Sequence, residues 1–139
     1  MPEQIQLDVV TPERRVLAEK VDAVYVPGLS GEFGILAGHT PLISRLQTGV
    51  LTYIQAGMTE KLHVAGGFIE VNQDRVTVLA DVAERPEEID AARARLANQH
   101  AEKALSGWSG TEDDFEVARA RLERSLVRLQ LASGASPER

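Results

Sequence analysis

The stretch GEFGILAGHTPLISRLQTG, from Gly31 to Gly49, decides the fold. In it, four glycines and one proline interrupt short apolar runs. Glycine adopts positive φ without the steric penalty of a Cβ atom, and proline removes a backbone donor, so the segment must bend several times. Such a segment is typical of a corner in a small β-sandwich or barrel, where strands leave one sheet and enter another.

Short β-rich runs flank this stretch from residue 4 to residue 82 and end in turn residues such as Asn72-Gln-Asp. They predict an all-β domain over residues 1–83, a sandwich or flattened barrel. Gly66-Gly67 predicts a bulge or a close backbone approach. The alternating positions are Ile5, Leu7, Val9; Val21, Ala23, Tyr25; Val50, Thr52, Ile54; and Val76, Val78, Ala80. The larger core candidates are Phe33, Phe68, Tyr25 and Tyr53.

The architecture changes after residue 82, since eight of the eleven glycines lie at or before Gly67 and none lies between Gly67 and Gly107. Pro86, followed by two glutamates, predicts the start of a helix that runs to about Ser106. Its expected apolar stripe is thin and rich in alanine, and contains Ile89, Ala92, Leu96, Ala97, Ala104 and Leu105.

A second helix is predicted after the loop at Ser106–Gly110, because Thr111-Glu-Asp-Asp114 matches a capping box. We expect this helix to end near Gly134, with an apolar face of Phe115, Ala118, Leu122, Leu126 and Leu129. The fold class is therefore α+β: an N-terminal all-β sandwich, an antiparallel two-helix hairpin over residues 84–133, and a disordered tail over residues 134–139.

Composition excludes several functions. The net charge of −6 argues against nucleic acid as a partner, and no apolar run is long enough to insert into a membrane. Cysteine is absent, and His39, His63 and His100 lack ligand spacing, so we expect no metal site. Each of the three lysines follows a glutamate, which leaves no phosphate-binding loop. We expect no catalytic residues and no required cofactor.

Several stretches in this order resemble the epsilon subunit of bacterial and chloroplast-type rotary ATP synthases. They are Gly31–Gly49, LDVVTP from Leu7, VAGGFIEV from Val64 and VTVLA from Val76. The resemblance implies a non-catalytic rotor subunit of a proton-translocating ATP synthase, peripheral on the cytoplasmic face of the inner (plasma) membrane. Its implied partners are the gamma subunit, the polar loops of the c-ring and, through the C-terminal helix, the catalytic alpha and beta subunits. Glu32 and His39 are the implied residues of the rotor interface.

The segment IDAARA, from Ile89 to Ala94, resembles the nucleotide-binding motif of some epsilon subunits. The resemblance implies ATP as a regulatory ligand that holds the hairpin down. Without it, Asp90 and Arg93 are explained by a surface ion pair three residues apart. The implied nucleotide-binding residues are Glu84, Ile89, Asp90, Arg93, Ala94, Arg124 and Arg128.

Basic residues on the second predicted helix are a further candidate site. Arg121, Arg124 and Arg128 are implied to contact the catalytic subunit and to inhibit ATP hydrolysis, although a solvated helix face also explains them. A thin alanine stripe buries little apolar area, so the hairpin is expected to open at small cost; a permanently folded hairpin is the alternative. The other function left open is a free-standing β-sandwich adaptor that senses nucleotides. A jelly-roll enzyme has no supporting residues.

Overall fold

The structure is a computed structural model that describes residues 3–106 and 110–132. It divides into two units, Met1–Arg85 and Pro86–Arg139, which are treated separately below. The expected tail at residues 134–139 and the centre of the expected loop at residues 107–109 lie outside the described residues.

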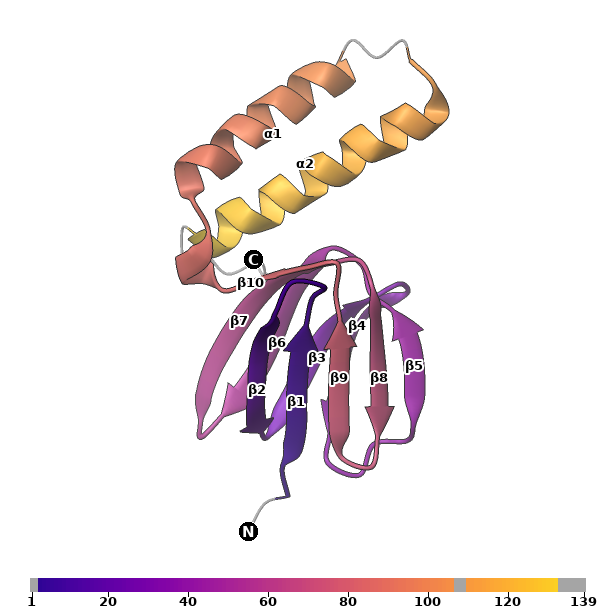
Figure 1. Cartoon of the computed structure of the whole chain (residues 1–139), viewed down its shortest axis with the longest axis vertical. Coiled ribbons are helices and arrows are strands. Elements are labelled where there is room, and N and C mark those ends of the chain that lie inside the picture. The colour runs from indigo at the N-terminus through magenta and orange to yellow at the C-terminus, as the bar shows by residue number, and fades with distance from the viewer. Residues whose placement is uncertain (1–2, 107–109, 133–139) are drawn as a thin grey trace. The chain divides into compact units, whose positions relative to one another are not determined.

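The first unit is a β-sandwich, as the sequence predicted (Figure 1). One sheet has the strand order β2-β1-β9-β8-β5, and the other has the order β10-β7-β6-β3-β4. Within these orders only β1 and β9 pair in parallel. The strands are β1 (Ile5–Val10), β2 (Arg15–Val21), β3 (Ala23–Gly28), β4 (Gly31–Leu36), β5 (Leu42–Arg45), β6 (Gly49–Gln55), β7 (Met58–Ala65), β8 (Phe68–Asn72), β9 (Arg75–Leu79) and β10 (Val82–Glu84).

The core lies between the two sheets and follows the two-residue period of the strands. Ile5, Leu7 and Val9 are fully buried in it. In β6 the core positions are Leu51 and Tyr53, which alternate with the residues that first suggested the strand. Both sheets are therefore filled mainly by aliphatic side chains.

The prediction that all four aromatic residues fill the core was wrong for Phe68 and Tyr25. Phe68 is 50% exposed, because it alternates with the buried Ile69 on β8 and so points to the outer face. Tyr25 is only half-buried and lies over Gly34, where a Cβ atom would come within 2.8 Å of the tyrosine ring. Two aromatic rings are thus available to outer surfaces.

Gly66 and Gly67 form the corner at which the chain leaves β7 of one sheet and enters β8 of the other. Their φ angles are 69° and 94°, and a Cβ atom on Gly67 would lie 1.9 Å from the carbonyl oxygen of Leu79. Leu79 ends β9, where the chain crosses back toward β10. The predicted close backbone approach is confirmed, and it joins the two crossings.

The second unit contains the 3-10 helix η1 (Pro86–Glu88) and the helices α1 (Ala91–Ser106) and α2 (Glu112–Ala132). The predicted α-helix start at Pro86 was wrong, because Pro86 opens only the 3-10 turn. Asp90 caps α1 instead, since its Oδ1 accepts a hydrogen bond from the Arg93 amide at 3.1 Å. The cap at Thr111 is confirmed by a 3.1 Å bond from the Asp114 amide to Thr111 Oγ1.

The two helices run antiparallel and face each other through small and polar residues (Figure 1). The expected stripe on α1 was wrong: Leu96 is 56% exposed, and the buried residues are Ala94, Asn98 and Ala101. On α2, Ser125 is buried whereas Leu126 is 47% exposed. Small side chains let the helix backbones approach closely, which outweighs the larger apolar area of leucine at these positions.

We expect Gly67→Ala to destabilise the β-sandwich by at least about 3 kcal/mol, because its Cβ atom would meet backbone and its φ is positive. Gly57→Ala is the matched control, since Gly57 also has positive φ, at 77°, but faces open space. It should lower stability by only about 1–2 kcal/mol. Urea unfolding followed by circular dichroism measures both, and equal losses would contradict the close approach.

Candidate functional site

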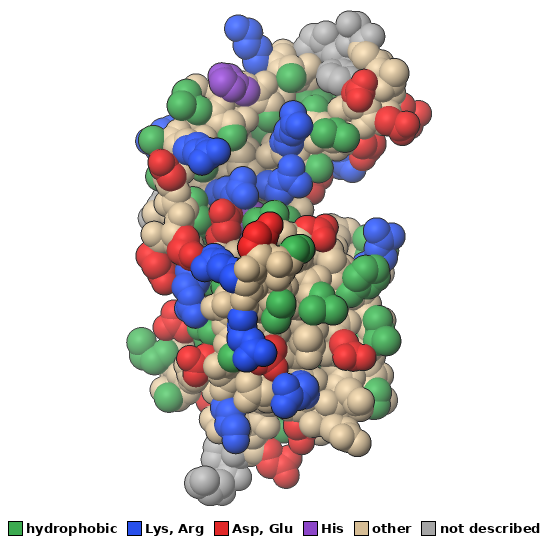
Figure 2. All heavy atoms as spheres, viewed as in Figure 1, with side chains coloured by type: hydrophobic (Ala, Val, Ile, Leu, Met, Phe, Trp, Pro, Cys, Tyr) green, Lys and Arg blue, Asp and Glu red, His purple; other side chains and the backbone are tan. Residues whose placement is uncertain are grey.

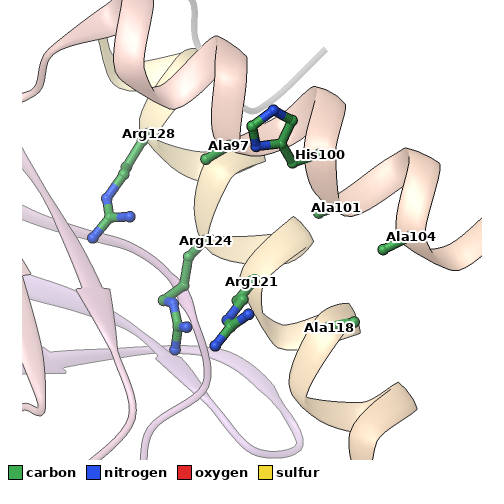
Figure 3. Close-up of a pocket in the computed structure, with 8 residues that line it drawn as sticks. All are labelled: Ala97, His100, Ala101, Ala104, Ala118, Arg121, Arg124 and Arg128. Carbon is green, nitrogen blue, oxygen red and sulfur yellow. The ribbon is translucent and has the colours of Figure 1, made fainter. Parts of the chain in front are cut away.

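A pocket of about 410 Å³ lies between α1 and α2 within the helical unit. Four alanines leave room for it, and its polar groups are His100 of α1 and three arginines of α2. In Figure 3 the guanidinium groups of the arginines extend to the same side of α2. The lining residues are Ala97, His100, Ala101, Ala104, Ala118, Arg121, Arg124 and Arg128.

The pocket is cationic, because the acids of α2 are engaged elsewhere. Glu116 and Glu123 lie 3.0 and 3.4 Å from the guanidinium of Arg119, which is not a lining residue. The hydrogen bond to Glu116 raises the pKa of Arg119. No acid lines the pocket, so planar guanidinium groups face it without a lining carboxylate. Such an arrangement suits an anion with several oxygens, such as a phosphate chain.

The motif from Ile89 to Ala94 lies at the start of α1, and its members have structural contacts there. Asp90 caps the helix, and the buried Ala94 donates its amide to the Asp90 carbonyl at 3.0 Å. Ile89 is half-buried, and Arg93 is exposed and does not line the pocket. Of the expected nucleotide-binding residues, the pocket therefore brings together only Arg124 and Arg128, with Arg121 beside them.

Glu84, another expected nucleotide-binding residue, is held by a buried histidine of the β unit. The two residues are paired across β10 and β7, and His63 Nδ1 lies 2.8 Å from Glu84 Oε1. His63 is fully buried, and its Nε2 has no hydrogen-bond partner among the described residues. Because a carboxylate accepts, Nδ1 donates in this bond and the ring orients Glu84.

A buried polar pair joins the two helices and was not predicted. Asn98 Nδ2 donates to Ser125 Oγ at 3.2 Å, and that hydroxyl donates to the Leu122 carbonyl at 2.8 Å. Ser125 is 1% exposed, so an unpaired amide or hydroxyl at this point would lose hydration without replacement. The pair therefore fixes the register of the hairpin.

The two expected rotor-interface residues lie at opposite ends of β4. Glu32 pairs with Pro27 beside the β3–β4 turn, whereas His39 follows the other end of the strand. β4 is the edge strand of one sheet, and the next strand, β5, is the edge strand of the other. Glu32 and His39 can share one interface only if it extends along this edge of the sandwich.

An apolar patch of Ile43, Phe68 and Leu79 covers the outer face of the sheet beside this edge. Phe68 pairs directly with Leu79, and the three side chains are between 50% and 70% exposed. Figure 2 shows hydrophobic side chains gathered over the region of β5 and β8. Leu36, which is 61% exposed, continues the apolar surface at the end of β4. Surfaces of this kind mark sites of association with other proteins.

Two searches of the described residues bear on chemistry and on the membrane. Residues 3–106 and 110–132 hold no group of three histidine, aspartate or glutamate side chains placed to bind a metal ion. No helix within the same ranges is long and apolar enough to cross a membrane.

Together, the apolar patch of the sandwich and the cationic pocket of the hairpin define a binding protein that docks onto other chains. Residues 4–86 match the family model "ATP synthase, Delta/Epsilon chain, beta-sandwich domain", and residues 87–133 match "ATP synthase, Delta/Epsilon chain, long alpha-helix domain". The chain belongs to this family, whose members are non-catalytic subunits of the ATP synthase central stalk. ATP synthesis and ion transport are the processes that follow from this membership.

The relatives match over nearly their whole length. The ATP synthase epsilon chain of Geobacter sulfurreducens is 43% identical over 136 residues, covering 98% of this chain and 99% of the relative. That of Herpetosiphon aurantiacus is 48% identical over 130 residues, covering 92% and 93%. A chain in the Euglena gracilis mitochondrial ATP synthase structure (OSCP/F1/c-ring) superposes with a TM-score of 0.77 at 29% identity, covering 91% of this chain and 79% of that one.

We expect Ser125→Ala to destabilise the hairpin by about 1 kcal/mol, because the buried Asn98 amide loses its acceptor. Adding Asn98→Ala should cause a further loss smaller than the loss from Asn98→Ala alone. Thermal unfolding followed by far-ultraviolet circular dichroism measures the cycle, with the exposed Gln99→Ala as control. Strictly additive losses would show that the two side chains do not interact.

Proposed function

We propose that this chain couples the gamma subunit to the polar loops of the c-ring and restrains ATP hydrolysis through its helical hairpin, with relief by bound ATP. The proposal places it as a peripheral subunit on the cytoplasmic face of the inner (plasma) membrane. The observation that carries the coupling role is the exposed apolar patch beside β4 and β5, in a chain of this family. The similar Euglena chain comes from an assembly that includes a c-ring, which supports the same role.

The apolar patch is suited to gamma, because an interface needs a dry centre and a polar rim. Phe68 and Leu79 supply the centre, and Arg45 is paired beside Phe68 on β5. Glu32 and His39 lie at the two ends of the neighbouring strand, where they suit polar contacts at the rim with gamma and the c-ring loops. Removing large apolar groups from such a centre weakens binding more than removing rim groups.

The cationic pocket supports ATP as the regulatory ligand. Arg124 and Arg128, with Arg121, offer donors for phosphate oxygens, and the alanines leave space between the helices. Glu84, Ile89, Asp90, Arg93 and Ala94 remain proposed contacts from the resemblance. A nucleotide at this pocket would contact both helices and favour the closed hairpin, because it binds that state better than the open one.

The same arginines give the hairpin a second role when it opens. Arg121, Arg124 and Arg128 would then face carboxylates of the catalytic alpha and beta subunits and oppose rotation in the hydrolysis direction. The hairpin closes through alanine, asparagine and serine rather than through large apolar side chains, so little apolar area is lost when it opens. ATP and the catalytic subunits would compete for one set of cations.

For the coupling role, we expect Ile43→Ser with Phe68→Ser to weaken binding to purified gamma at least about tenfold, because both side chains leave the centre of the interface. Met58→Ser is the matched control, since Met58 is 63% exposed but lies on β7, away from β4 and β5. Titration calorimetry measures all three chains. Equal weakening by the control would contradict docking through the apolar patch.

For the regulatory role, we expect Arg124→Ala to lower ATP affinity about tenfold, because a charge-assisted bond to phosphate is lost. Arg119→Ala is the control, as it removes one charge from the same helix outside the pocket. Equilibrium binding of ATP to the full chain measures both.

The same pair of variants tests the brake in the cognate catalytic complex. Full-length chain should inhibit ATP hydrolysis at micromolar ATP and less at millimolar ATP, and the triple change Arg121→Ala, Arg124→Ala, Arg128→Ala should abolish inhibition. Inhibition that persists in the triple variant would overturn the role of these arginines.

A further inference from the structure

The loop between β4 and β5 is tied to the opposite turn of the sandwich by one short hydrogen bond. The Gly38 amide in this loop donates to Asp74 Oδ1 at 2.6 Å, and Asp74 belongs to the turn between β8 and β9. The two residues are 36 positions apart in the sequence. Because the acceptor is a carboxylate, this bond is of the stronger, charge-assisted kind.

The backbone of Asp74 is itself held in place. Its φ is 57°, a left-handed conformation that aspartate, asparagine and glycine tolerate better than other residues. Its carbonyl accepts a hydrogen bond from the Gln6 amide of β1 at 2.9 Å. The carboxylate therefore projects from a turn that is fixed to the neighbouring strand.

The bond to Gly38 orders the residue that follows it, His39. The His39 amide donates to the Leu36 carbonyl at 3.2 Å, and its Nδ1 lies 2.6 Å from the Thr40 carbonyl. A carbonyl can only accept, so Nδ1 carries a proton in this arrangement. In the neutral ring, Nε2 is then an acceptor, and His39 is only half-buried.

We propose that Asp74 is a positioning residue that orders the His39 loop, so that His39 Nε2 is presented as an acceptor to an N–H or O–H donor of the rotor partner. This inference rests on the proposed rotor function and assigns the chemistry that the partner must supply at this end of β4. The sequence marked Asp74 only as a turn residue.

Asp74 also lines a polar hollow of about 440 Å³ with Gln4, Gln6, Lys20 and Arg75. Its charge could therefore act on Lys20 and Arg75 instead of on the loop. Asp74→Asn separates these effects, since asparagine keeps an acceptor oxygen and tolerates the left-handed backbone but carries no charge. Asp74→Gly keeps the backbone and removes the acceptor. Gln73→Gly, at φ 50° in the same turn, is the control for added flexibility.

The experiment uses the full chain in two measurements. Titration against a purified gamma and c-ring subcomplex should show binding weakened about tenfold by Asp74→Gly, because a bond to a charged group is lost, and about threefold or less by Asp74→Asn. Gln73→Gly should bind as the unchanged chain does. Nitrogen NMR of the unbound chain near pH 8, where a free imidazole is largely neutral, should show His39 protonated at Nδ1, and Asp74→Gly should shift the proton toward Nε2.

The outcomes separate this proposal from the proposed function. If the unchanged chain fails to bind the subcomplex, the rotor function is overturned, and the NMR measurement still decides whether Asp74 orders His39. If Asp74→Gly leaves either the His39 tautomer or the affinity unchanged, the positioning role is wrong. If Asp74→Asn weakens binding as much as Asp74→Gly, the carboxylate acts through charge and the hydrogen-bond account is overturned.

Discussion

The backbone contact at Gly67 is the constraint on which the β unit depends. The chain crosses between the sheets at Gly66–Gly67 and crosses back after Leu79, and the two crossings touch without room for a Cβ atom. The Gly67 carbonyl also accepts a hydrogen bond from the Leu46 amide at 3.0 Å, which ties the end of β5 to the same corner. Once this corner is set, the two-residue period of β8 directs Ile69 inward and Phe68 outward. A glycine pair thus determines both the closure of the core and the position of the apolar patch.

The helical unit depends on a different balance. Its helices meet through Ala94, Ala101 and the Asn98–Ser125 pair, so specificity comes from close approach and one polar contact rather than from a large apolar area. This packing leaves a pocket with three arginines from one helix face. A hairpin that buries little apolar surface can exchange between states at small free-energy cost, and a polyanion or a carboxylate-bearing partner can each bias that exchange. The weakness of the packing is therefore consistent with a regulatory role.

Much of the fold was predictable because it follows from local rules. The strand runs, the Gly66-Gly67 corner and the Thr111 cap each depend on residues close in sequence. The outward position of Phe68 and the α1 start at Asp90 were missed, since either of two neighbouring residues could take the role and tertiary packing decided. The Glu84–His63, Asn98–Ser125 and Gly38–Asp74 contacts span 21, 27 and 36 residues, and no local pattern announces them. Family resemblance marked Arg124 and Arg128 correctly as neighbours, but not the pocket that they share with His100.

The most direct test of the central claim, that the sandwich docks onto gamma beside β4 and β5, is amide hydrogen exchange of the full chain with and without gamma. The account predicts that protection on binding concentrates at residues 36–45 and 68–72, which hold the His39 loop, β5 and β8. Strands β2 and β7 should exchange as in the free chain, since neither neighbours that edge. Protection centred on β2 or β7, with residues 36–45 unchanged, would contradict the account.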